Sequence, residues 1–219
     1  MRATAIVPTF NRWTWMPSVI RCFLAQSFQD SELLIVNDGD DPSIGCVPDH
    51  PRVRYIKLDG PRRTIGEKRN ICCDLAHGEL IIHADDDDWS GPNRIAHQVA
   101  ELDRSGKQVL GYHNILLFDQ VRGRAHRYNQ TNGQPLWAFA HGATFCYRRE
   151  FWLGHEFENR SGKEDSFFAK AADKRGQFVS VDAGLNAVLR VHGNNAYPPP
   201  LDRIVCIGGR EQIPEGFFA

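Results

Sequence analysis

Strand-like and helix-like segments alternate over the first 90 or so residues, and this order constrains the fold more than any other feature of the sequence. The strand-like apolar runs are residues 3–7, 32–36, 53–58 and 80–82, and the helix-like segments are residues 17–24 and 67–77, the second with Gly78 as its expected stop. Strands that alternate with helices favour parallel pairing with right-handed crossovers. The sequence therefore predicts an α/β fold, with a doubly wound, mainly parallel sheet flanked by helices.

Polar residues follow three of these expected strands. Pro8-Thr9 closes the first, Asn37-Asp38 follows the second, and Asp85 to Asp88 follow the fourth. Ligands of open α/β sheets bind at the carboxyl ends of the strands. We therefore expect a binding site along this edge of the sheet.

The pattern changes after about residue 95, where we expect a smaller mixed region. It has a helix at 94–104, strand-like runs at 109–118 and 124–129, a helix at 164–175 and a strand pair within 178–191. The tail, with three prolines at 198–200, is expected to be irregular and could pack as a lid. No repeat or linker interrupts the chain, which predicts one domain over residues 1–219, with halves at 1–92 and 93–192 and a tail at 193–219.

Composition narrows the class of protein. The 219 residues carry a formal net charge of -1 with a sequence pI of about 6.7, which argues against a basic nucleic-acid binder without excluding a local patch. No run approaches the roughly 18 apolar residues of a membrane helix, and no signal-peptide pattern opens the chain. Six cysteines without a CxxC pair favour reduced thiols. We therefore expect a cytoplasmic protein.

The four consecutive aspartates suggest a metal site. In extended backbone, residues two apart share a face, so Asp85 and Asp87 would converge on one cation while Asp86 and Asp88 point elsewhere. Mg²⁺ and Mn²⁺ prefer one or two carboxylates together with phosphate oxygens. The alternative is a solvated acidic turn, but the position at the end of a strand favours the metal.

Three segments in this order resemble the family 2 glycosyltransferases. They are residues 5–12 (AIVPTFNR), 34–39 (LIVNDG) and 78–88 (GELIIHADDDD), and the resemblance covers about residues 3–192. It implies the nucleotide-binding A-type (GT-A) fold, with a donor-binding first half, an acceptor-side second half and transfer that inverts the anomeric centre.

The resemblance implies a donor site for a nucleotide sugar. The residues that would line the nucleotide pocket are Pro8, Thr9, Phe10, Asn11 and Arg12, with Phe10 near the base. Asp38 would accept a hydrogen bond from a base imino group, which suits uracil. Asp40 stands where the family often has serine, and Asp38 could instead cap a turn before Gly39.

Phosphate contacts are implied for basic residues in the segment before the second helix. Arg63 and Arg69 would contact the diphosphate, since an arginine fork suits phosphate oxygens. Asp85 and Asp86 would also face the donor. A solvated helix start explains Glu67 and Lys68 equally well.

The acceptor side is implied by Glu164-Asp165 at the start of a helix. Asp165 would be the general base on the acceptor hydroxyl and Glu164 an acceptor contact, whereas a purely structural role would be to stabilise the helix dipole. His192 would be a third metal ligand beside Asp85 and Asp87. Trp137 could form an acceptor platform or belong to the core. His83, His113 and His141 receive no role.

The sequence therefore predicts a glycosyltransferase that moves a sugar from a nucleotide-diphosphate sugar, most simply a UDP-sugar, with Mn²⁺ or Mg²⁺. The resemblance also implies single transfers, because processive members of that family usually carry a Gln-x-x-Arg-Trp motif and membrane helices, and this sequence shows neither. Two alternatives remain open at this stage: a nucleotidyltransferase of similar fold, or an inactive binding module. The acceptor could be a glycan, a lipid-linked glycan, a protein or another molecule.

Overall fold

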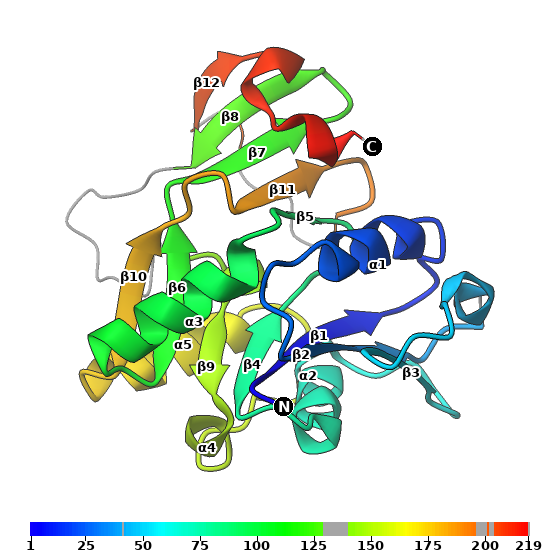
Figure 1. The fold of residues 1–219 in the computed structure, drawn as a ribbon, viewed down its shortest axis with the longest axis vertical. Helices are drawn as coiled ribbons and strands as arrows, with labels where there is room; N and C mark the ends of the chain where they lie inside the picture. The colour runs from blue at the N-terminus through cyan, green and yellow to red at the C-terminus, as the bar shows by residue number, and fades with distance from the viewer. Residues whose placement is uncertain (41, 129–139, 196–200, 202–203, 219) are drawn as a thin grey trace.

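Two sheets make up the fold of the computed structural model, which describes residues 1–40, 42–128, 140–195, 201 and 204–218 (Figure 1). Within these residues the larger sheet has seven strands in the order β10-β6-β9-β4-β1-β2-β3. Its strands are β1 (Ala3–Thr9), β2 (Ser31–Asn37), β3 (Val53–Lys57), β4 (Leu80–His83), β6 (Val109–His113), β9 (Cys146–Arg148) and β10 (Phe178–Asp182). All pairs are parallel except those of β9, which runs antiparallel to β4 and β6.

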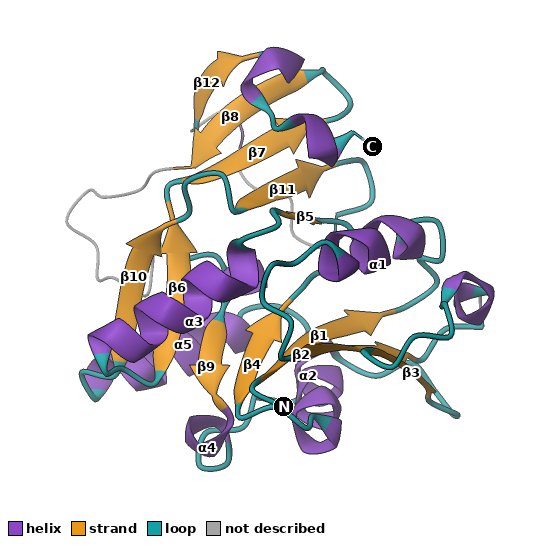
Figure 2. Ribbon diagram, viewed as in Figure 1, coloured by secondary structure: helices purple, strands orange, loops and turns teal. Residues whose placement is uncertain are grey.

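Helices cover both faces of this sheet (Figure 2). The helices are α1 (Met16–Leu24), α2 (Ile65–Leu75), α3 (Arg94–Ser105), α4 (Arg149–Trp152) and α5 (Glu164–Lys174). In β2, Leu33 and Ile35 belong to the apolar cluster that includes α1 and α3, whereas Leu34 and Val36 belong to the cluster that includes α2 and α5. Successive side chains of a strand point to opposite faces, so a run that is apolar throughout is buried on both sides. The doubly wound α/β prediction is confirmed.

The second sheet lies beyond the carboxyl ends of β4, β6 and β10 (Figure 1). In the described residues it has five strands in the order β12-β8-β7-β11-β5, namely β5 (Trp89–Ser90), β7 (Ile115–Asp119), β8 (Arg124–Tyr128), β11 (Ala187–Val191) and β12 (Val205–Gly208). The larger sheet takes strands from both sides of residue 92, so the expected halves do not correspond to the two sheets.

The apolar run at 109–118 is not one strand, as we expected, but two. Asn114 takes a left-handed conformation, with φ of 55°, and separates β6 in the larger sheet from β7 in the second. Asparagine tolerates this conformation better than most residues, and its amide donates a hydrogen bond to Asp182 (2.6 Å). The chain therefore changes sheets at a single residue.

Two strands lie within 178–191, as we expected, but they do not pair with each other. β10 pairs in parallel with β6, while β11 pairs in parallel with β7 in the other sheet. The tail differs from the irregular segment that we expected, because β12 pairs antiparallel with β8 and Phe217 is buried against Phe118. The three prolines at 198–200 lie outside the described residues.

The second helix ends earlier than Gly78, its expected stop. α2 ends at Leu75, and Gly78 instead lies against the start of β1, where a Cβ would come within 2.6 Å of the Thr4 nitrogen. Gly78 also donates its N–H to the Thr4 hydroxyl (2.9 Å). No helix in the described part of the chain is long and apolar enough to cross a bilayer.

Candidate active site

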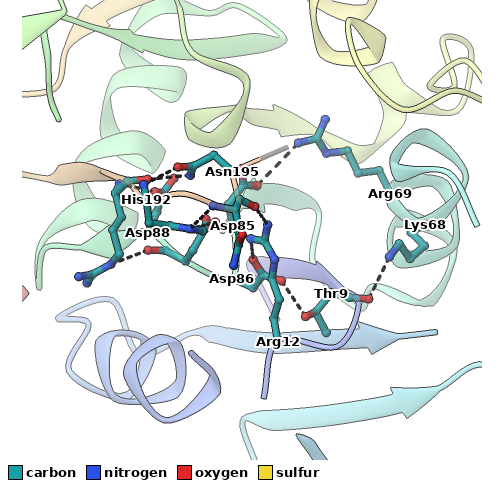
Figure 3. A network of polar contacts seen from close by, with 12 residues as sticks. Thr9, Arg12, Lys68, Arg69, Asp85, Asp86, Asp88, His192 and Asn195 are labelled. Carbon is teal, nitrogen blue, oxygen red and sulfur yellow. Dashed lines mark hydrogen bonds and ion pairs between the residues drawn. The ribbon is translucent and has the colours of Figure 1, made fainter. Parts of the chain in front are cut away.

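Polar side chains meet at the carboxyl edge of the larger sheet, as Figure 3 shows for a part of them. Thr9 ends β1, Asp38 follows β2, and the four aspartates 85–88 follow β4. β1 pairs in parallel with both β2 and β4, so these three strands end side by side. The topology brings together residues that are up to about 80 positions apart in the sequence.

The four aspartates form a turn and not the extended segment that the sequence analysis assumed. The Asp88 N–H donates to the Asp85 carbonyl (3.4 Å), and the chain then enters β5. A turn removes the simple alternation of faces. Asp85 and Asp87 do both line one cavity, but so does Asp88, whose Oδ1 accepts the N–H of Arg190 (2.8 Å).

Arg12 joins the first loop to this turn. Its Nη1 donates to Asp86 Oδ1 (2.8 Å) and also contacts Asp87 Oδ2, while Thr9 donates its hydroxyl proton to Asp86 Oδ2 (2.7 Å). Burial and the neighbouring charge of Asp87 raise the pKa of Asp86 to about 6. The guanidinium therefore neutralises a pair of carboxylates that would otherwise repel each other.

Asp87 also contacts His192, so these two predicted metal ligands lie next to each other. His192 Nε2 lies 2.9 Å from Asp87 Oδ2, and His192 Nδ1 accepts the Asn194 N–H (3.2 Å). Since Nδ1 accepts, the proton of the neutral ring is on Nε2 and is donated to Asp87. Burial opposes ionisation of Asp87, but His192 and Arg12 outweigh it and lower the pKa of Asp87.

The predicted metal ligands fit a cation only in part. Among the described residues no three His, Cys, Asp or Glu side chains are grouped as a metal site. Asp87 and His192 are adjacent, whereas Asp85 faces the guanidinium of Arg69, with Oδ1 3.7 Å from Nη2. Mg²⁺ and Mn²⁺ need only one or two protein ligands when substrate phosphates supply the rest. The donor set fits a cation shared with a diphosphate.

Asp38 is held by a buried lysine that the sequence analysis treated as an ordinary helix residue. Lys68 Nζ donates to Asp38 Oδ1 (2.7 Å) and to the Thr9 carbonyl (2.9 Å), and the Arg63 N–H donates to Asp38 Oδ2 (2.6 Å). The Asp38 side chain is 0% exposed. The turn before Gly39 is capped by Asn37, whose Oδ1 accepts the Gly39 N–H (2.7 Å), so Asp38 does not serve as that cap.

The remaining residues of the predicted nucleotide pocket lie in the loop after β1. Phe10 stacks with the guanidinium of Arg62, whose Cζ is 4.2 Å from the ring centre. Asn11 has a left-handed φ of 53° and lies against Gly39, where a Cβ would approach the Asn11 nitrogen to 2.6 Å. Pro8 lies within β1 and pairs with Val36. The loops after β1 and β2 are therefore packed directly on each other.

A cavity of 430 Å³ opens beside this loop. The residues that line it are Phe10, Asn11, Arg12, Thr14, Trp15, His192, Gly193 and Asn194. The rings of Trp15 and His192 stack with centroids 5.4 Å apart. Four of the residues that we predicted to bind donor or metal thus face one space.

Arg69 is buried between two carboxylates. Its Nη1 donates to Glu164 Oε1 (2.5 Å), and its Nη2 approaches Asp85 Oδ1. Burial outweighs the charge of Arg69 and raises the pKa of Glu164. The other oxygen, Glu164 Oε2, is buried without a hydrogen-bond partner in the described part of the molecule. The pair connects the aspartate turn to the start of α5, and contacts of either residue with a substrate stay predictions.

Asp165 lines a second cavity, of 450 Å³, together with the aspartate turn. The residues that line it include the carboxylates Asp85, Asp87, Glu164 and Asp165, and Leu117, Tyr128, Leu189, Arg190 and Val191 from the second sheet. Asp165 is partly buried, and its Oδ1 accepts the Ser166 N–H (2.6 Å). The cavity therefore brings the Asp165 carboxylate together with the aspartate turn and with apolar side chains of the second sheet.

Sequence reasoning missed Lys68, His141 and Arg190. His141 lines the same cavity as Asp165, and Arg190 Nε donates to the Asp87 carbonyl (2.9 Å). Spacing gives no signal for these three, because each reaches the site through a tertiary contact. Trp137, the predicted platform residue, lies outside the described residues.

Fold and site together define a class of protein. A mainly parallel sheet covered on both faces, with carboxylates after β2 and β4 and a further carboxylate from α5 in the same cavity, matches the GT-A arrangement that the sequence resemblance implied. The profile described as Glycosyl transferase family 2 matches residues 4–176. The chain therefore belongs to glycosyl transferase family 2.

Two relatives with similar sequences are named as glycosyltransferases, in agreement with this assignment. The chain is 27% identical over 152 residues to the putative glycosyltransferase EpsE of Bacillus subtilis (strain 168), which covers 67% of this chain and 54% of that protein. It is 30% identical over 137 residues to the putative colanic acid biosynthesis glycosyl transferase WcaA of Escherichia coli (strain K12), which covers 60% and 47%. The chain thus spans about half the length of these relatives.

Solved structures show the same fold. S. aureus TarS 1–349 in complex with UDP-GlcNAc matches with a TM-score of 0.70 at 18% identity, over 92% of this chain and 63% of that one. Mannosyltransferase PcManGT from Pyrobaculum calidifontis, in complex with GDP-Man and Mn²⁺, matches with a TM-score of 0.70 at 17% identity, over 89% and 58%. The GT-A expectation is confirmed.

Proposed function

We propose that this protein transfers a sugar from a UDP-sugar to an acceptor hydroxyl, one sugar per encounter and with inversion. The observation that carries the proposal is the pair of adjoining spaces at the carboxyl edge. One lies beside the loop of Phe10 and Arg12, and the other contains Asp165. The aspartate turn stands between them, since Asp87 bonds His192 of the first and lines the second.

The nucleotide would lie beside the first loop. Asp38 is ion-paired with Lys68, and its remaining lone pairs would accept from a base N–H once the loops after β1 and β2 open, because the Asp38 side chain is 0% exposed here. Uracil offers such an imino N–H. The complex of TarS with UDP-GlcNAc supports a uridine donor, while that of PcManGT with GDP-Man shows that this fold also accommodates guanosine.

Asp87 and His192 would hold a divalent cation, Mn²⁺ or Mg²⁺, which requires His192 Nε2 to give up the proton that it donates to Asp87 here. When bound, the cation stabilises the negative charge that builds on the departing diphosphate. Arg12 neutralises the same carboxylates here, so it would have to share or release Asp87 when a cation binds. The PcManGT complex with Mn²⁺ supports a cation in this fold.

Asp165 would remove the proton from the acceptor hydroxyl. As the hydroxyl oxygen bonds to the anomeric carbon on one face, the bond from that carbon to the diphosphate oxygen breaks on the other. One carboxylate is sufficient for this single displacement. The partly buried position of Asp165, in the cavity that the aspartate turn also lines, supports this role. The apolar residues of the same cavity, among them Leu117 and Leu189, suit the C–H face of an acceptor such as a sugar.

Release of nucleoside diphosphate from a set of donors tests the proposal. Purified protein is incubated with UDP-glucose, UDP-galactose, UDP-GlcNAc and GDP-mannose in Mn²⁺, with and without simple glycoside acceptors. We expect release from a UDP-sugar, and D165N should lower that turnover by about 10²- to 10⁴-fold while sparing UDP affinity. No release from any donor, with UDP bound normally, would indicate an inactive binding module. Near-normal turnover in D165N would remove Asp165 from the mechanism.

A further inference from the structure

The carboxylate of Asp165 occupies space that only a glycine leaves open. A Cβ on Gly142 would fall 2.5 Å from Asp165 Cγ and would overlap Oδ2 outright. The φ of Gly142 lies outside the left-handed region, so its backbone conformation does not itself demand glycine. Gly142 matters because it has no side chain, which lets the Asp165 carboxylate approach the loop closely.

Gly142 is itself bound by a buried histidine under the site. His83 Nδ1 lies 2.7 Å from the Gly142 carbonyl oxygen, and His83 Nε2 lies 3.2 Å from the Tyr147 hydroxyl. A carbonyl can only accept, so Nδ1 carries the proton and Nε2 accepts from Tyr147. The Tyr147 oxygen is then free to accept from the Cys73 thiol (3.2 Å). One tautomer of a neutral His83 satisfies the whole chain of hydrogen bonds.

Buried polar groups from α3 bind the residues that follow Gly142. Arg94 Nη2 donates to the Ala143 carbonyl (2.8 Å) and to the His83 carbonyl (2.6 Å), and Gln98 Nε2 donates to the Thr144 carbonyl (2.6 Å). Arg94 is 2% exposed and Gln98 0%. Such fully satisfied buried networks fix a backbone in one position. The short 3-10 turn Gly142–Thr144 is therefore held from two sides.

We propose that His83 and Gly142 are positioning residues for the carboxylate of Asp165. His83 fixes the Gly142 carbonyl, and the bare Cα of Gly142 fixes where Asp165 Oδ2 can lie. The inference rests on the proposed role of Asp165 as the base. It adds that the base is placed by a loop 23 residues before it in the chain, and by a histidine that touches neither donor nor acceptor. A displacement of a reacting group by about 1 Å can cost about 10²-fold in rate, so this contact governs turnover.

The first test compares two variants, G142A and G154A, in each of which one glycine gains a methyl group. G142A forces Asp165 away, whereas G154A is a matched control, because Gly154 has no heavy atom within 4 Å of the added Cβ and no left-handed φ. We expect G142A to lower the turnover of UDP-sugar by about tenfold to 10²-fold with UDP affinity unchanged, and G154A to resemble the wild type. A crystal structure of G142A should show the Asp165 carboxylate displaced. Turnover of G142A equal to that of G154A would overturn the proposal.

The second test separates the two hydrogen bonds of His83. An asparagine amide reaches the place of Nδ1 and keeps the bond to Gly142, while a glutamine amide reaches the place of Nε2 and keeps the bond to Tyr147. Both changes remove the ring, so H83N and H83Q should lose similar stability. We expect H83N to retain about tenfold more turnover than H83Q, with equal UDP affinity. Equal losses in the two variants would mean that His83 has only a structural role.

The outcomes also separate this inference from the proposed function. If the wild type binds UDP but releases no UDP from any sugar donor, the proposed function fails. If the wild type turns over and D165N does not, but G142A and both His83 variants follow their stability alone, the base stands and its positioning by Gly142 fails.

Discussion

Breaking the buried pair between Lys68 and Asp38 is the change whose consequences the structure defines best. In K68M the Asp38 carboxylate, 0% exposed, loses its only ionic partner in the described part of the chain, and the Thr9 carbonyl loses a donor. Removing one member of a buried pair typically costs about 3–5 kcal/mol. Asp38 keeps the Arg63 N–H, so we expect the lower end of that range.

That loss converts to a measurable change in melting temperature. For a chain of this length each kcal/mol shifts Tm by about 2–4 °C, so K68M should melt about 6–12 °C lower for a loss of about 3 kcal/mol. In D38N/K68M no buried charge is left unpaired, and part of the loss should be recovered. A double-mutant cycle in urea would then show a coupling of about 1–3 kcal/mol. A K68M protein within about 1 kcal/mol of the wild type, or strictly additive changes, would refute the buried pair.

Two further predictions follow from the site. Chelation of Mn²⁺ should sharply lower the affinity of the wild type for UDP, measured by calorimetry. In D87A, the UDP affinity should be the same with and without Mn²⁺. Equal wild-type affinity with and without the metal would contradict the metal site. Burial and the charge of Arg69 hold the pKa of His83 well below 6.5, so the folded state keeps the ring neutral where the unfolded chain takes up a proton. The stability this supplies is present above about pH 6.5 and is lost as the pH falls, by up to about 1.4 kcal/mol per pH unit. Between about pH 7.5 and about pH 5.5, the free energy of unfolding measured in urea should therefore fall more in the wild type than in H83N. Equal falls in the two proteins would contradict a neutral buried His83.

Within the larger sheet, β1, β2 and β4 were predictable because their residues are buried on both faces, whereas β9 was not predicted. A continuous apolar run such as Leu33 to Val36 is buried on both faces, which places it between two layers of helices. The change of sheet at Asn114 was not predictable, since one asparagine within an apolar run carries no such signal. Its conformation depends on a bond to Asp182, 68 residues later. The two strands within 178–191 were predicted, but not that they belong to different sheets.

The site was predictable where it depends on the ends of strands. Thr9, Asp38 and the aspartates were located because parallel strands end at one edge. Lys68 was missed because GEKRN reads as a solvated helix start, and only the packing of α2 against the loop after β1 buries its amine. The contact between Gly142 and Asp165 was missed because a close approach leaves no trace in either local sequence.

Calorimetric titration of UDP and GDP in Mn²⁺ tests most directly that the carboxyl edge is a nucleotide-sugar site. We predict that UDP binds to the wild type more tightly than GDP does, and that D38N weakens UDP binding while G154A leaves it unchanged. Failure of both nucleotides to bind to folded protein would contradict the site itself. Tighter binding of GDP, or a D38N protein with wild-type affinity for UDP, would contradict the assignment of Asp38 to the base.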